Sequence, residues 1–147
     1  MKFSILFLSL VNSIYAFGQD SVATVNMDSL TAKAKCFFVI GSGGGFTGQE
    51  VKYYVFSSGQ VYREDKLAKK SVLVKTIPKN EVKGLFKKLK SLNLEKMDFK
   101  HPGNMTYTLE KHSKGKEHTI TWGDRAAATP PEVADFYKMV MEKISTQ

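Results

Sequence analysis

The sequence contains very little cysteine: Cys36 is the only one among 147 residues. A single thiol cannot form a disulfide within the chain, so packing alone must stabilise the fold, even in an oxidising compartment. Metal sites that are built from cysteine pairs are excluded as well. Because Cys36 begins an apolar run that ends at Ile40, we expect its thiol to be buried and unreactive.

Apolar runs long enough to cross a membrane are also missing. The longest, residues 3–17, is interrupted by serine and asparagine and falls short of the ~20 mainly apolar residues that a spanning helix needs. Lys2 precedes this run and small residues follow it, an organisation typical of a secretory signal peptide. We therefore predict a signal peptide over residues 1–18, cleaved after Gly18. The mature protein is then periplasmic or secreted and has no membrane or lipid anchor.

Acidic residues are outnumbered, with 14 Asp and Glu against 22 Lys and Arg, and the net charge of the chain is +8. Such a charge favours anionic partners or surfaces. The lysines are nevertheless spread along the chain, for example at Lys69, Lys88 and Lys114, which is typical of a solvated surface. We therefore predict no binding to nucleic acid.

Motifs for catalysis or metal binding are absent too. The three histidines, His101, His112 and His118, do not have the spacing of metal ligands, and no HExxH sequence occurs. His112 and His118 could meet across a hairpin, although two exposed side chains are the simpler interpretation. The chain has no Gly-x-Ser-x-Gly segment and no distinct pair of carboxylates. We predict that the protein is not an enzyme and uses no cofactor or metal.

Glycine, by contrast, is concentrated in residues 42–48, Ser-Gly-Gly-Gly-Phe-Thr-Gly. The spacing Gly-x-Gly-x-x-Gly within this segment matches a dinucleotide-binding motif, but that motif requires a helix to follow it. Residues 50–56 alternate like a strand instead, which disfavours nucleotide binding. Two interpretations remain open. The glycines permit a tight connection between strands, or they let a partner approach the backbone, with Phe46 as an anchor.

The remaining pattern predicts six strands and two helices. Apolar alternation and turn residues place strands at residues 36–41, 50–56, 61–63, 71–76, 104–110 and 117–122. Residues 122–125 follow the last strand and are interpreted as a turn in which Asp124 bonds to nearby backbone, with a binding role as the alternative. A three-and-four apolar spacing predicts one helix between the hairpins and another at the end of the chain. We expect Thr129 to cap the final helix, Pro130 to be its first residue and Glu132 to complete a capping box.

These elements predict an α+β fold: an antiparallel sheet of two hairpins with both amphipathic helices packed on one face. Residues 36–147 are then a single α+β domain, and we expect a monomer. Residues 19–35 are polar, have no sustained period and are interpreted as a flexible leader. The side chains expected to meet in the core are Val55, Phe86, Leu89, Tyr107, Ile120, Phe136 and Val140.

The order of these elements and two local motifs resemble the emfourin family. The motifs are Gly-Gly-Phe-x-Gly at residues 44–48 and the pair Pro130-Pro131, and the resemblance covers about residues 37–144. Emfourins are small proteinaceous inhibitors of thermolysin-like zinc metallopeptidases such as protealysin. This chain differs in its exported leader and in a lysine-rich connection at residues 64–75. The resemblance implies an α+β fold and a stoichiometric protein–protein contact rather than turnover.

We therefore expect an exported proteinaceous inhibitor of a thermolysin-like metallopeptidase that acts by stoichiometric binding. Its partner is then a secreted peptidase, or another protein. The expected partner-binding residues are Ser42, Gly43, Gly44, Gly45, Phe46, Thr47 and Gly48. The alternative is a non-enzymatic, extracytoplasmic protein-interaction domain with an unknown partner, and a third interpretation is a small hydrolase, because one fold can serve several functions.

Overall fold

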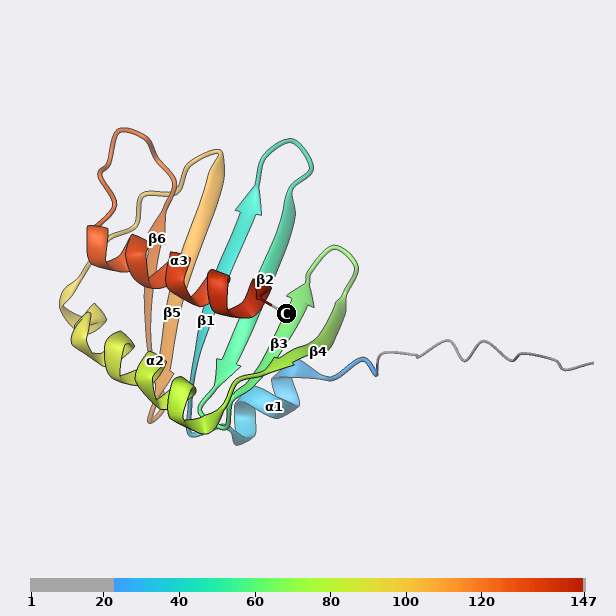
Figure 1. Ribbon diagram of the computed structural model, residues 1–147. Helices are drawn as coiled ribbons and strands as arrows, with labels where there is room; N and C mark the ends of the chain where they lie inside the picture. The colour runs from blue at the N-terminus through green and yellow to red at the C-terminus, as the bar shows by residue number, and fades with distance from the viewer. Residues whose placement is uncertain (1–22, 147) are drawn as a thin grey trace, which may run out of the picture.

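The computed structural model of the chain describes residues 23–146, so the predicted signal peptide at residues 1–18 lies outside the described part. The centre of the fold is one antiparallel sheet in the strand order β4-β3-β2-β1-β5-β6 (Figure 1). Its strands are β1 (Cys36–Gly44), β2 (Gln49–Phe56), β3 (Gln60–Asp65), β4 (Lys70–Thr76), β5 (Met105–Ser113) and β6 (Lys116–Trp122). The α+β class is confirmed, and each strand overlaps a segment that the sequence pattern predicts as a strand.

Strand β1 joins the two predicted hairpins into a single sheet. It pairs with β2 on one side and with β5 on the other, along nearly its whole length. Phe38 and Ile40 are buried on one face of the sheet, and Phe37 and Val39 are buried on the other. A central strand that is covered on both faces is apolar at consecutive positions, which explains this run. The expected sheet of two hairpins was incomplete because it gave this strand no place between them.

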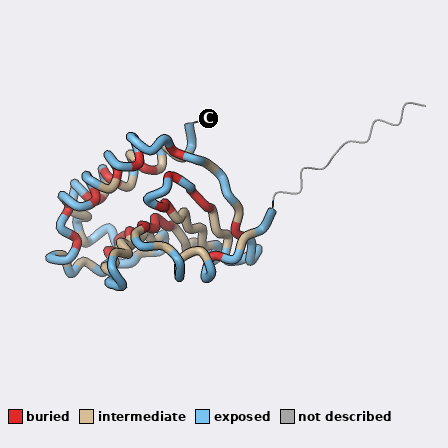
Figure 2. Tube along the Cα trace, turned by 90° about the horizontal axis from the view of Figure 1, so that it is seen from below, coloured by how far each residue is buried: buried red, intermediate tan, exposed pale blue. Residues whose placement is uncertain are grey.

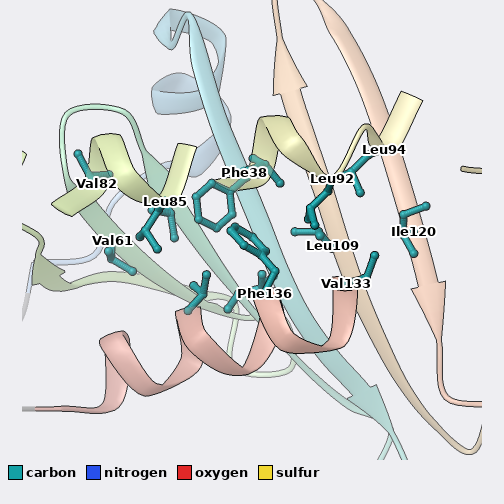
Figure 3. Close-up of a cluster of buried hydrophobic side chains, with 14 of the residues drawn as sticks. Phe38, Val61, Val82, Leu85, Leu92, Leu94, Leu109, Ile120, Val133 and Phe136 are labelled. Carbon is teal, nitrogen blue, oxygen red and sulfur yellow. The ribbon is translucent and has the colours of Figure 1, made fainter. Parts of the chain in front are cut away.

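Helices α2 (Lys79–Ser91) and α3 (Pro131–Ser145) lie across one face of the sheet and form the main core with it (Figure 1). Seen from below, buried positions recur along both helices and in the sheet beneath them (Figure 2). The ring of Phe38 lies between α2 and α3, with centroids 5.3 Å from Phe86 and 5.5 Å from Phe136 (Figure 3). The expected core is confirmed, with Phe86 and Tyr107 half-buried at its edge.

The opposite face of the sheet is partly covered by α1 (Met27–Lys33) (Figure 1). The interpretation of residues 19–35 as a flexible leader is therefore corrected for residues 23–35, the part of it that the structure describes. Met27 is buried in a second apolar cluster with Phe37, Val39, Phe56 and Tyr62. Just before the helix, the N–H group of Val25 donates a hydrogen bond to the Ser71 carbonyl at 2.8 Å. A helix of only two turns has little intrinsic stability, so tertiary contacts rather than local propensity maintain it.

The start of α3 differs from the predicted capping box. Pro130, not Thr129, is the N-cap residue, the helix begins at Pro131, and no side chain caps it. Pro130 has an extended ψ of 120°, because the residue before a proline is excluded from the helical region. Its carbonyl nevertheless accepts hydrogen bonds from the N–H groups of Val133 and Ala134. Glu132 is in the first turn, where an acidic side chain interacts favourably with the helix dipole.

Two further sequence-based expectations concern single features. Cys36 is partly exposed rather than buried, because a cavity between α2 and the β5–β6 hairpin opens beside it. Among residues 23–146, no helix is long and apolar enough to span a bilayer.

Candidate functional site

The glycine-rich segment forms the turn between β1 and β2, at one end of the sheet (Figure 1). Ser42, Gly43 and Gly44 are the last residues of β1, and residues 45–48 are the turn itself, which we call the β1–β2 tip. The side chain of Phe46 at this tip is fully exposed, with a relative exposure of 108%. The possibility that Phe46 packs into the core is therefore excluded.

Two glycines attach the β1–β2 tip to the segment that precedes β5. Gly44 has a φ of +108°, and any Cβ at this position would overlap the carbonyl oxygen of Asn104. The N–H group of Gly45 donates a hydrogen bond to the same oxygen at 2.7 Å. This close approach requires glycine at position 44, so the glycines do serve the turn. The same contact fixes the backbone on which Phe46 is mounted.

Gly44→Ala is expected to lower the free energy of unfolding by more than about 2 kcal/mol. The substitution combines the strain of a left-handed alanine, ~1–2 kcal/mol, with steric overlap against Asn104. Gly48→Ala is the matched control: its φ is also positive, +61°, but no atom lies within 4 Å of the added Cβ, so only the strain remains. Urea unfolding of both variants measures the difference. Equal losses would contradict the close approach at Gly44.

Two other loops lie beside the β1–β2 tip at the same end of the sheet (Figure 1). Met105 at the start of β5 is exposed, and its Sδ atom lies 3.2 Å from the position of a Cβ at Gly45. In the loop after β6, the Asp124 carboxylate accepts a hydrogen bond from Ala126 N–H at 2.9 Å, which confirms the predicted turn. Arg125 and Met105 line one shallow cavity between these two loops. Met105 therefore adjoins the β1–β2 tip at Gly45, and Arg125 shares a cavity with Met105.

Three aromatic side chains support β1 below the tip. Tyr137 of α3 packs edge-on against Tyr107 and Trp122, with centroids 5.6 Å and 5.3 Å away. Its hydroxyl donates to the Gly41 carbonyl of β1 at 3.4 Å. Burial raises the pKa of Tyr137, so the phenol remains a neutral donor at physiological pH. The tip thus extends from a packed base.

The other face of β1 near the tip is a shallow polar groove. Gly43 forms its floor, with Thr106 and Thr108 on one side and Glu50 on the other. Thr108 leans over Gly41, where a Cβ would be 2.7 Å from its Oγ1 atom. Among the described residues, this Oγ1 is the one buried side-chain polar atom without a hydrogen-bond partner. Of the seven predicted residues, Gly43, Gly44 and Gly48 line this groove together with Ser42, whereas Phe46 points into solvent.

Sequence reasoning found the tip but missed Asn104 and Met105. Their contribution depends on the pairing of β1 with β5, which are separated by about sixty residues, and no local pattern indicates it. The alternative that His112 and His118 meet across the second hairpin is excluded. His112 pairs with Glu117 and His118 pairs with Lys111, so the two imidazoles belong to opposite faces of the sheet.

No protein-family model matches this chain, and no curated protein matches it significantly.

Proposed function

We propose that this protein is an exported inhibitor of a thermolysin-like metallopeptidase and that it acts by stoichiometric binding. The observation that carries the proposal is the full exposure of Phe46 on a fixed hairpin tip. A large aromatic side chain that contributes nothing to the core is the residue type that dominates binding energy at protein interfaces. Because the tip is anchored, little conformational entropy is lost when it binds.

The shape of the tip suits an enzyme cleft. Phe46 and Thr47 are the only residues of the turn with a side chain, because Gly45 and Gly48 flank them. A partner can therefore contact the backbone of the tip on both sides of the aromatic ring. Met105 and Arg125 border the same end of the sheet and would contact the rim of such a cleft. This arrangement favours insertion of a narrow, rigid element over contact between two flat surfaces.

The proposal predicts stoichiometric loss of activity when a thermolysin-like peptidase is titrated with the mature protein. When the enzyme concentration is well above the dissociation constant, the rate of hydrolysis of a small peptide substrate should fall linearly with added protein. It should reach its minimum at one equivalent of the protein per enzyme. Trypsin, which has no active-site metal, is the control and should keep its activity. Undiminished hydrolysis at a large molar excess of the protein over the enzyme would contradict the proposal. Inhibition that disappears as the peptidase cleaves the protein would contradict it as well. A negative panel of zinc and serine peptidases would favour a protein-interaction domain with another partner.

A further inference from the structure

Three side chains with metal-binding chemistry meet on the β5–β6 hairpin, on the face that α1 partly covers. Glu110 and His112 are two residues apart on β5 and therefore lie on the same face. Glu117 of β6 pairs directly with His112 and joins them there. One ligand atom from each can be chosen so that all three lie within 4.8 Å of one another. No other such group of three occurs among residues 23–146.

The histidine of this group, which we call the Glu-His-Glu cluster, lies between the two carboxylates. Its Nε2 atom is 3.3 Å from Glu110 Oε2, and its Nδ1 atom is 3.8 Å from Glu117 Oε2. The imidazole of His112 stacks on Phe37, with centroids 4.3 Å apart and an angle of 9° between the planes. This stacking holds the ring in one orientation. Each of its nitrogens therefore remains within 4 Å of a carboxylate oxygen.

Neighbouring groups orient the two carboxylates. Lys52 Nζ donates to Glu110 Oε1 at 2.7 Å, which leaves Oε2 directed at the imidazole. On β6, the hydroxyl of Thr119 donates to Glu117 Oε1 at 3.3 Å, which leaves Oε2 on the side of His112. Hydrogen bonds of this kind, from outside the ligand set, are a regular feature of metal sites because they orient the ligands.

A cavity gives access to the cluster. It lies beside α1 and is lined by Asp28, Tyr54 and the three cluster residues, together with apolar and basic groups around them. The side chains become more exposed along the cluster, from 14% at Glu110 through 24% at His112 to 60% at Glu117. An ion could therefore enter past Glu117 and reach the imidazole. Asp28 adds a third carboxylate to the cavity in a protein whose net charge is +8.

We propose that the Glu-His-Glu cluster binds a Zn²⁺ ion. One imidazole nitrogen and two carboxylate oxygens form a ligand set that Zn²⁺ accepts, and three protein ligands leave a coordination position for water or another donor. Lys52 forms an ion pair with one carboxylate oxygen of Glu110 and places a positive charge near the ion. Because this charge repels the ion, we expect a dissociation constant in the micromolar range rather than a lower one. This inference is independent of the proposed peptidase inhibition, because the cluster and the β1–β2 tip are separate sites.

Calorimetric titration of the mature protein, without a histidine tag, with ZnCl₂ tests the site. We expect one equivalent of Zn²⁺ to bind and MgCl₂ to give no comparable heat, because Mg²⁺ prefers oxygen ligands. His112→Ala and Glu117→Gln should each weaken Zn²⁺ binding at least ~10-fold, the smallest loss typical of even a supporting group. His118→Ala is the matched control, because His118 lies on the same hairpin but on the opposite face. It should bind Zn²⁺ like the unaltered protein.

His112→Ala also removes the stacking on Phe37 and could therefore destabilise the fold. In that case Glu117→Gln still tests the site. Glu117 is largely exposed, so its amide variant should fold normally. Zn²⁺ should raise the melting temperature of the unaltered protein and raise that of Glu117→Gln less, because an ion that binds only the folded state stabilises it. The proposal is overturned if Zn²⁺ does not bind, if neither cluster variant changes binding, or if His118→Ala weakens binding as much as His112→Ala does.

Discussion

Phe136→Ala is expected to lower the free energy of unfolding by about 3–5 kcal/mol, the usual cost of truncating a buried phenylalanine. Phe136 is completely buried on α3, and its ring packs against Phe38 of the central strand (Figure 3). Small domains have a total stability of ~5–15 kcal/mol, so this single cavity should remove a large part of it. Urea unfolding followed by circular dichroism measures the loss.

Leu73→Ala is the control for this prediction, because Leu73 is an exposed apolar residue on the edge strand β4. Substitutions at such positions usually change the stability by less than about 0.5 kcal/mol. A loss below about 1 kcal/mol for Phe136→Ala would show that α3 does not pack on the sheet through this face.

Phe46→Ala should have the opposite profile: a large effect on binding and almost none on stability. Loss of a hot-spot aromatic weakens binding by at least ~2 kcal/mol, which is about 30-fold in the dissociation constant. The ring of Phe46 is fully exposed, so its removal leaves no cavity. The melting temperature should therefore stay nearly unchanged. Surface plasmon resonance with the target peptidase measures the dissociation constant of the variant. A thermal melt of the free variant measures its melting temperature.

Leu67→Ala is a matched control for Phe46→Ala, since Leu67 is another exposed apolar side chain in a turn, between β3 and β4. Its removal should change neither the affinity nor the melting temperature. Unaltered affinity of Phe46→Ala together with a depressed melting temperature would remove the β1–β2 tip from the binding site.

Local patterns were sufficient to predict the strands and the long helices. The period-two alternation in β5 and β6 and the three-and-four spacing in α2 and α3 both arise because each element buries one face. The position of β1 at the centre of the sheet could not be predicted in this way, because it depends on pairing between distant segments. Helix α1 was missed because seven residues are too few for a clear period.

The two candidate sites also differ in whether local sequence predicts them. The β1–β2 tip is recognisable from consecutive residues, whereas the Glu-His-Glu cluster depends on the register of the second hairpin. Lys114 and Gly115 both have a positive φ, as in a two-residue type I′ turn, so Ser113 pairs with Lys116 and His112 with Glu117. A register shifted by one residue would transfer each side chain of one strand to the other face. A meeting of His112 with His118, the alternative that the sequence left open, would need such a shift.

The most direct test of the proposed inhibition is a competition between this protein and a small zinc-binding ligand for the active site of a thermolysin-like peptidase. If the β1–β2 tip occupies the cleft, saturating the active site with the small ligand should prevent the protein from binding. The protein should in turn displace the ligand with one-to-one stoichiometry. A complex that forms equally well when the active site is filled would contradict insertion of Phe46 into the cleft.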